Sequence, residues 1–145
     1  MAVIRRLLDD GQFNVSAIIR PTSKYSPPTS KDVKVVVADF EDHGSLVTAL
    51  RGQDALVCCV GGTQTKFDQQ KLLIDASVEA GVKLFFASEY SGNIVSTHYR
   101  VLPTQFVGEK LRVREYLEEK AAAGQMAWTA LNGGPFFDMC ESYLP

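Results

Sequence analysis

Two kinds of hydrophobic pattern alternate along this chain. In some stretches apolar residues recur three or four positions apart, which places them on one face of a helix. Between these stretches lie short runs that are apolar or β-branched almost throughout, as in strands of a parallel sheet covered on both faces. The pattern predicts helices over 2–10, 44–50, 64–80 and 103–123, and strands over 13–19, 33–38, 55–60, 82–87 and 126–131.

The regular alternation of strand and helix determines the expected architecture. Strands that are apolar along their whole length need cover on both faces, and right-handed crossover helices between parallel strands provide it. A chain of 145 residues, 46% of them hydrophobic, is long enough for one compact core. The sequence therefore predicts an α/β fold with a doubly wound parallel sheet, in one domain.

Charge and composition exclude several classes of partner. The formal net charge is −2 and the pI is about 5.7, and Lys and Arg are scattered, so we expect neither nucleic-acid nor anionic-membrane binding. No stretch approaches the roughly 20 apolar residues that cross a bilayer. The first residues also lack the layout of a secretion signal. We therefore expect a cytoplasmic protein.

Neither the cysteines nor the histidines indicate a metal site or a disulfide framework. Cys58 and Cys59 lie in an apolar run, where burial in the core is the expected role, and Cys140 is the third cysteine. His43 and His98 are the only histidines, and no arrangement of Cys, Asp or Glu around them suggests a metal. No metal is predicted, and His43 is expected to start a helix.

Two short motifs span the ends of predicted strands, and a third lies on the helix that follows the second. They are Val-Ala-Asp-Phe at 37–40, Phe-Ala-Ser-Glu-Tyr at 86–90, and Lys110 with Val113 and Arg114 on the next helix. With the order of elements, these residues resemble the NmrA-like and isoflavone-reductase-like proteins, which are atypical short-chain reductases with an NAD(P)-binding Rossmann fold. The resemblance covers essentially the whole chain. It implies an NADPH-dependent reductase of a small, aromatic or carbonyl-conjugated substrate.

Family members open with a strand, a G-x-x-G-x-x-G turn and a helix, and residues 2–8 resemble the rear of that helix. We expect a partial domain over 1–145 that lacks the first strand, the glycine-rich loop that receives the pyrophosphate, and the C-terminal substrate-binding region. Because the first strand of such a sheet is central, strands 13–19 and 55–60 must pair directly or leave buried backbone groups unpaired, at about 1 to 3 kcal/mol each. Low stability or aggregation is expected.

The residues expected at the adenosine end of NADP(H) follow two predicted strands. Arg20, with Ser23 and Lys24 nearby, stands where a dinucleotide fold meets the ribose, and a cation there suits a 2′-phosphate. The alternative is a solvated charge at a strand end. By resemblance, Asp39 and Phe40 lie on the adenine side, although an Asp that closes a strand is also a common turn residue.

Further candidates lie where the nicotinamide end is expected. Gly61 and Gly62 would let the cofactor approach the backbone, but an ordinary turn needs glycine equally. By resemblance, Ser88 and Glu89 shape the pocket and Lys110 is the proton shuttle. A lysine serves this role only if burial or a nearby cation lowers its pKa. The alternative for Lys110 is a solvated residue on a charged helix face.

The residues Tyr116 and Lys120 match the Y-x-x-x-K pattern of ordinary short-chain dehydrogenases. The match lies late in the long helix, beyond the end marked by Lys110, and such coincidences are common in charged helices. We expect no catalytic role for it.

Three hypotheses follow for the chain as a whole. The first is an NADPH-dependent reductase of a small molecule. The second is a non-catalytic NADP-binding regulator that binds a protein partner. The third is a product that does neither because its phosphate loop is missing.

Overall fold

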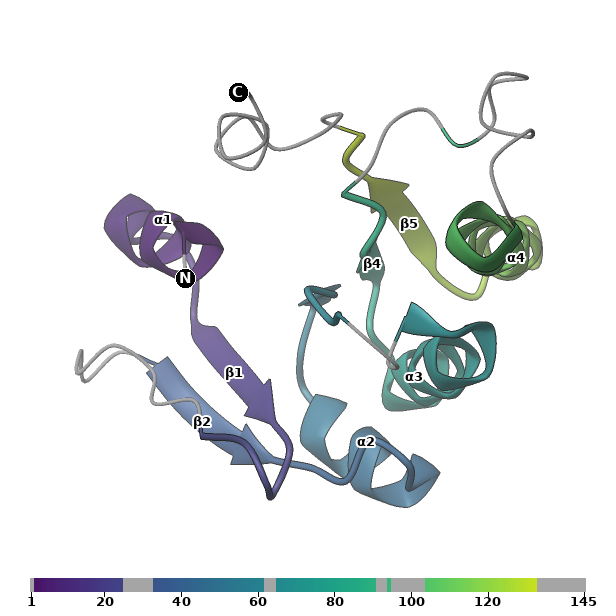
Figure 1. The fold of residues 1–145 in the computed structure, drawn as a ribbon. Coiled ribbons are helices and arrows are strands. Elements are labelled where there is room, and N and C mark those ends of the chain that lie inside the picture. Colours follow the sequence, from purple (N-terminus) through teal and green to yellow (C-terminus); the bar gives the residue numbers. More distant parts are fainter. Residues whose placement is uncertain (1, 25–32, 62–64, 91–93, 95–103, 133–145) are drawn as a thin grey trace, which may run out of the picture.

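The computed structural model describes residues 2–24, 33–61, 65–90, 94 and 104–132 (Figure 1). Every predicted helix and strand is present, and the largest differences are the earlier end of the strand predicted over 55–60 and the later start of the helix predicted over 64–80. In chain order the elements are α1 (Ala2–Asp10), β1 (Val15–Ile19), β2 (Val33–Val37), α2 (His43–Leu50), β3 (Ala55–Val57), α3 (Phe67–Ala80), β4 (Leu84–Ala87), α4 (Thr104–Ala122) and β5 (Ala127–Ala130).

Local chemistry sets the ends of two of the helices. At the start of α2 the Asp42 side chain accepts hydrogen bonds from the backbone N–H groups of Gly44 and Ser45, as an N-cap residue does. His43 is therefore the first helical residue, as expected. Helix α3 ends at Gly81, whose φ of 81° is a left-handed conformation that glycine adopts without steric cost.

The described strands form two parallel sheets rather than one. In the first, β1 pairs with β2, and Val15 to Ile19 lie opposite Val33 to Val37. In the second, β4 lies between β3 and β5. Within the described part of the chain no ladder joins β1 to β3, so each keeps one unpaired edge. Of the two expected outcomes for these strands, the structure has the one with open edges.

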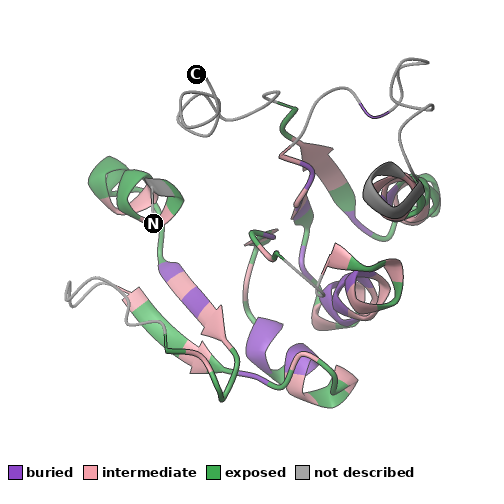
Figure 2. Cartoon of the chain, viewed as in Figure 1, coloured by how far each residue is buried: buried purple, intermediate pink, exposed green. Residues whose placement is uncertain are grey.

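The core lies between the β3–β5 sheet and helices α2, α3 and α4 (Figure 2). Helix α1 lies apart from the other three helices (Figure 1). Its apolar face is only half-buried, and the Val3 side chain is 40% exposed. The largest fully buried side chains are Leu46, Leu50, Cys58, Ile74, Ser77, Val82, Phe85, Ile94 and Leu117.

The two adjacent cysteines differ in burial. Cys58 is buried and its thiol contacts the side-chain oxygen of Gln70 on α3 at 3.4 Å, so the expectation for Cys58 is confirmed. The expectation for Cys59 is wrong, because this side chain is exposed. Successive side chains of an extended segment point to opposite sides, so only one of the pair can face α3. Burial raises the pKa of the Cys58 thiol to about 11.

Three of the residues singled out from the sequence, Gly62, His98 and Cys140, lie outside the described residues. In the described ranges, no helix is long and apolar enough to cross a membrane.

Candidate functional site

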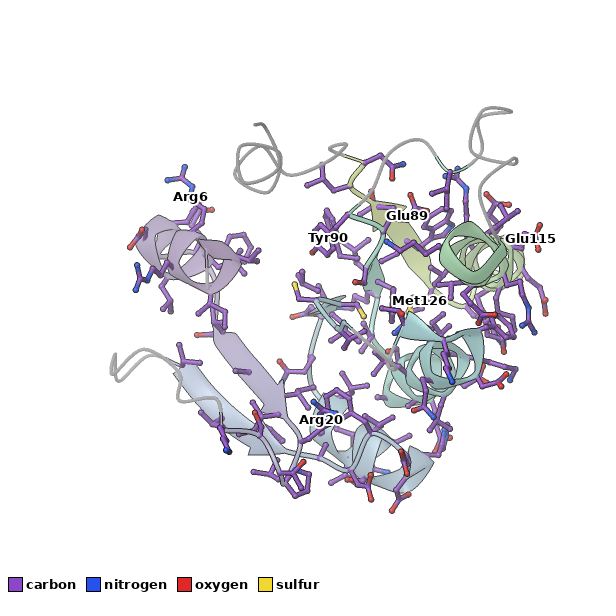
Figure 3. All side chains as sticks on the ribbon, viewed as in Figure 1. Arg6, Arg20, Glu89, Tyr90, Glu115 and Met126 are labelled. Carbon is purple, nitrogen blue, oxygen red and sulfur yellow. The ribbon has the colours of Figure 1, made fainter. Side chains whose placement is uncertain are left out.

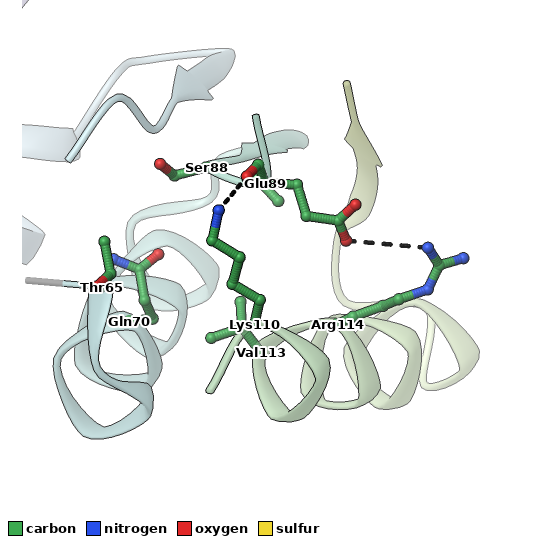
Figure 4. A pocket seen from close by; sticks show the side chains of 8 residues that line it. Thr65, Gln70, Ser88, Glu89, Lys110, Val113 and Arg114 are labelled. Atoms are coloured by element: carbon green, nitrogen blue, oxygen red, sulfur yellow. Dashed lines mark hydrogen bonds and ion pairs between the residues drawn. The ribbon is translucent and has the colours of Figure 1, made fainter. Parts of the chain in front are cut away.

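A small pocket lies where β4 ends, between that strand end and helices α3 and α4 (Figure 4). Its volume is about 10 Å³, which is near the lower limit for a single water molecule. It therefore has room for no more than about one water molecule. The pocket is lined by Thr65, Gln70, Ala87, Ser88, Glu89, Lys110, Val113 and Arg114.

Lys110 reaches into this pocket from α4. The side chain is half-buried, and its ammonium group donates a hydrogen bond to the backbone carbonyl oxygen of Glu89 (Figure 4). Burial lowers the pKa of Lys110 below its ordinary value, and the negative charge of Glu89 opposes that shift only in part. A lowered pKa is what a proton donor and acceptor near neutral pH needs.

The strand end that receives Lys110 is held in a turned conformation. The Ser88 hydroxyl donates to the carbonyl oxygen of Val60 at 3.1 Å, which ties the segment after β4 to the segment after β3. The Glu89 N–H donates to the Ala87 carbonyl oxygen at 2.8 Å. Tyr90 then has a positive φ of 35°, which is strained for a residue with a Cβ. Strain of this kind concentrates at functional sites.

Glu89 and Tyr90 point to opposite sides of this strand end, Glu89 toward α4 and Tyr90 away from it (Figure 3). The Tyr90 hydroxyl lies 3.3 Å from the Cys59 sulfur. Burial and this thiol contact raise the pKa of Tyr90, so its phenol stays protonated. The exposed Cys59 thus has a partner that the sequence did not indicate.

The Glu89 side chain is buried to an unusual degree for a carboxylate, with only 3% of the residue exposed. Both carboxylate oxygens are buried without a hydrogen bond. The side chain of Glu89 forms an ion pair with Arg114, whose guanidinium lies 3.9 Å from one of the carboxylate oxygens. The sequence expected Glu89 at the pocket by resemblance but gave no sign of this burial, which depends on helix α4 lying across the strand end.

Glu109, the neighbour of Lys110, also has a partner distant in sequence. Its carboxylate accepts a hydrogen bond of 2.5 Å from the Phe67 N–H, the first N–H of α3, and α3 has no side-chain cap from its own residue Lys66. The Arg112 guanidinium lies over the Phe67 ring at 4.1 Å. These contacts fix the start of α3 against the turn of α4 that carries Lys110, and sequence reasoning missed them.

The residues expected at the adenosine end belong to the other sheet. Arg20 is exposed at the end of β1 (Figure 3), and Lys24 is exposed four residues later. The Ser23 N–H donates to the Arg20 carbonyl oxygen at 2.9 Å and closes a turn. The Asp39 carboxylate accepts the Glu41 N–H at 2.9 Å, the contact typical of an Asx turn. Asp39 therefore has the turn role that the sequence left open.

Phe40 and Gly61 have different surroundings. Phe40 is half-buried and packs against the core. Gly61 is exposed, its φ is not positive, and a Cβ added there would meet nothing within 4 Å. The backbone alone therefore does not require glycine at this position, and approach of a cofactor to Gly61 stays a prediction.

Tyr116 and Lys120 lie on the contact between α3 and α4, and neither lines the pocket of Lys110. The Tyr116 hydroxyl donates to the Asp75 carboxylate on α3 at 2.5 Å, and the Lys120 ammonium lies 3.3 Å from the same oxygen. Both side chains thus have partners in helix packing.

His43 is paired with Glu79 at 2.8 Å, which joins the start of α2 to α3. Across the ranges that the structure describes, no three side chains of His, Cys, Asp or Glu gather closely enough to hold a metal ion.

Comparison with known proteins gives a consistent result. The model of the NmrA-like family matches residues 1–138. The chain is 33% identical to the oxidoreductase aprR of Aspergillus flavus over 143 residues, which is 98% of this chain and 47% of that protein. The chain thus spans about half the length of this curated relative.

Solved structures give the same fold. A crystal structure of isoflavone reductase matches with a TM-score of 0.71 at 25% identity, over 92% of this chain and 45% of that one. The triphenylmethane reductase of Citrobacter, complexed with NADP(H), matches with a TM-score of 0.72 at 20% identity, over 95% and 46%. The fold is that of the NAD(P)-binding Rossmann-like reductases, and on the family match the chain belongs to the NmrA-like family.

Proposed function

We propose that this chain carries the cofactor-binding and proton-transfer part of an NADPH-dependent reductase of a small aromatic or carbonyl-conjugated molecule. The observation that carries the proposal is the half-buried ammonium of Lys110 at the carboxyl end of β4, with its pKa lowered by burial. In open α/β sheets, ligands lie beyond the carboxyl ends of the strands. The oxidoreductase and isoflavone reductase relatives support the same class of reaction.

Two groups of residues suit the cofactor. Arg20 and Lys24 offer exposed cations at the end of β1, which fits the 2′-phosphate that distinguishes NADP from NAD. Ser88 and Lys110 offer a hydroxyl and an ammonium at the end of β4, where the nicotinamide half would lie. The NADP(H) bound to the triphenylmethane reductase supports this choice of cofactor.

The residues of the chain supply the acid. When bound, NADPH supplies a hydride to the substrate. The ammonium of Lys110 delivers the proton that completes the reduction, and its nitrogen then regains a proton from solvent. Because burial already weakens the hold of this amine on its proton, the transfer costs less than it would from an exposed lysine. The carbonyl oxygen of Glu89 holds the amine in place throughout.

Two measurements on the purified chain test the proposal. Titration with NADPH, followed by its fluorescence, should give saturable binding in the micromolar range, and Arg20→Ala should weaken binding of NADPH about tenfold while leaving NADH binding nearly unchanged. Absence of NADPH binding would contradict the cofactor assignment.

The second measurement concerns Lys110. With a panel of aromatic enones and quinones, NADPH consumption should fall by about 10² or more in Lys110→Met, while the Kd for NADPH stays within about twofold. Unchanged turnover would refute the catalytic assignment. Lys83→Met, which removes an exposed lysine paired with Asp54 far along the β3–β5 sheet from the pocket, is the control.

One observation favours a second function. The pocket beside Lys110 is too small to enclose a substrate, and a site of this size suits a regulator that binds NADP without reducing anything. Such a regulator would bind NADPH with the expected affinity and consume none with any substrate of the panel. A protein partner would then recognise the NADP-bound form of this chain.

A further inference from the structure

The buried carboxylate of Glu89 poses an electrostatic problem beside Lys110. A buried charge is costly unless a partner of opposite sign accompanies it. Neither oxygen of Glu89 has a hydrogen-bond donor in the described part of the chain, and Arg114 at 3.9 Å supplies the compensating charge. In this geometry the Glu89 carboxylate therefore depends on Arg114 for a compensating charge.

Arg114 is itself held in place by its surroundings. Its guanidinium donates to the Glu118 carboxylate at 3.1 Å, one turn further along α4. It also lies over the Trp128 ring, 5.3 Å from the ring centroid, on β5. Contacts on two elements thus orient the guanidinium toward Glu89.

Lys110 and Arg114 reach opposite ends of the same residue. They are four positions apart, so they project from one face of α4. The Lys110 ammonium meets the backbone carbonyl oxygen of Glu89, while the Glu89 carboxylate extends away from Lys110 toward Arg114 (Figure 4). One helix face therefore holds the backbone and the side chain of Glu89 with two separate cations.

We propose that Arg114 is a positioning residue for Lys110, which draws the Glu89 carboxylate away from the ammonium and leaves the Lys110 proton free to be transferred at the pocket. With Arg114 absent, Lys110 is the cation that remains beside Glu89 among the described residues. An ion pair between Glu89 and Lys110 would then hold the proton. The inference rests on the proposed function only in that the proposed substrate accepts the proton of Lys110.

The other groups around Lys110 do not replace Arg114. From α3 and the turn before it, Gln70 and Thr65 face the pocket, and both are uncharged. On α4, the Glu109 carboxylate is occupied by the Phe67 N–H and lies 3.6 Å from Arg112. Among the described residues, the charge facing Lys110 from the end of β4 is that of Glu89, which opposes the lowering of the Lys110 pKa. Burial therefore lowers the pKa of Lys110, and the Glu89 carboxylate, which Arg114 holds away from the ammonium, raises it.

The test is a titration of Lys110 in the whole chain, without cofactor or substrate. Lysines are dimethylated with ¹³C-formaldehyde, the Lys110 signal is assigned from the Lys110→Arg spectrum, and its chemical shift is followed against pH by NMR. In Arg114→Met the pKa of Lys110 should rise by on the order of one unit. Arg114→Lys, which keeps the charge, should restore at least half of that difference.

A double-mutant cycle separates positioning from simple loss of packing. Glu89→Gln should lower the pKa of Lys110, and adding Glu89→Gln to Arg114→Met should abolish the rise. Lys83→Met, which removes an exposed lysine paired with Asp54, is the control and should leave the pKa of Lys110 unchanged. If Arg114→Met fails to fold by circular dichroism, Arg114→Gln takes its place in the cycle, and the same outcomes are expected.

Two results would overturn the inference. One is an unchanged Lys110 titration in folded Arg114→Met or in Glu89→Gln. The other is a rise in Arg114→Met that persists in the double variant, because the effect would then not pass through Glu89. Failure of the native chain to bind NADPH would contradict the proposed function but would not affect the titration result. If the native chain consumes NADPH as proposed and the pKa of Lys110 is the same in Arg114→Met, only the inference is contradicted.

Discussion

The Asp75 carboxylate joins α3 to two side chains of α4, and we predict that Asp75→Asn destabilises the fold by about 1–2 kcal/mol. Asp75 accepts the Tyr116 hydroxyl at 2.5 Å and pairs with Lys71 at 2.6 Å and Lys120 at 3.3 Å. A hydrogen bond to a charged group contributes about 1.5–3 kcal/mol, and partly exposed pairs contribute about 0.2–1 kcal/mol each. Asparagine keeps an acceptor for the Tyr116 hydroxyl, so only part of the stabilisation from these three contacts is lost.

The same substitution has a pH signature. Burial raises the pKa of Asp75, but the hydrogen bonds from Lys71, Tyr116 and Lys120 outweigh it and leave the pKa below 3.8. A carboxyl group whose pKa is lower in the folded state stabilises the fold fully above its unfolded value, and the stabilisation is lost as pH falls through the folded pKa. The difference between the native chain and Asp75→Asn should be constant from pH 7 to 5 and shrink below about pH 4.

Urea denaturation followed by fluorescence of the single tryptophan, Trp128, measures the effect. With an m-value of about 2 kcal/mol/M, the midpoint should fall by about 0.5–1 M. Asp54→Asn is the matched control, because Asp54 pairs with Lys83 at 2.7 Å with both side chains about four-fifths exposed, at 83% and 78%. A loss in Asp75→Asn no larger than in the control, or one that persists unchanged at pH 3, would refute the reasoning.

Two further stability predictions use the same assay. Glu109→Gln should lower the free energy of unfolding by about 1 kcal/mol, because α3 loses the carboxylate that accepts its first N–H. This destabilisation should be smaller in high salt, and a destabilisation independent of salt would count against a charged cap. Gly81→Ala should cost about 1 kcal/mol because of the positive φ, whereas Gly61→Ala, without that constraint, should stay within about 0.5 kcal/mol; equal effects would show that conformation is not the cause.

Much of the fold is readable from the sequence because its periodicities are strong. The i, i+4 spacing of α1 and the left-handed stop at Gly81 identify their elements without any partner. The arrangement of the strands is less local. Whether β1 would pair with β3 depends on contacts distant in the sequence, and in the described part of the chain no ladder joins these two strands.

The site was predictable in part, and the reason again is distance along the chain. Lys110 and Ser88 could be named because they stand at motif positions, and the structure brings both to one pocket. The caps and pairs that hold them could not be named. The Glu109 carboxylate reaches a helix start 42 residues away, and Arg114 compensates a carboxylate 25 positions earlier in the sequence. Such partners exist only after the helices have packed.

The division into two sheets also means that the two ends of the proposed cofactor site differ in rigidity. Lys110 lies among α3, α4 and β4, where Phe85 and Leu117 are fully buried. The Arg20 end lies on a two-stranded sheet in which Val35 is 40% and Val37 is 59% exposed. Regions with few buried apolar contacts open at low free energy.

Hydrogen exchange should therefore be faster for the β1 and β2 amides than for those of β4, and saturating NADPH should slow exchange in β1 most. Binding stabilises the state that binds, by about 2.7 kcal/mol at a ligand concentration of 100 Kd. Because a cofactor that contacts both Arg20 and Lys110 must hold two separately formed sheets together, the less stable sheet gains most from it. Equal protection in β1 and β4 without cofactor would show that the open edges do not weaken the first sheet.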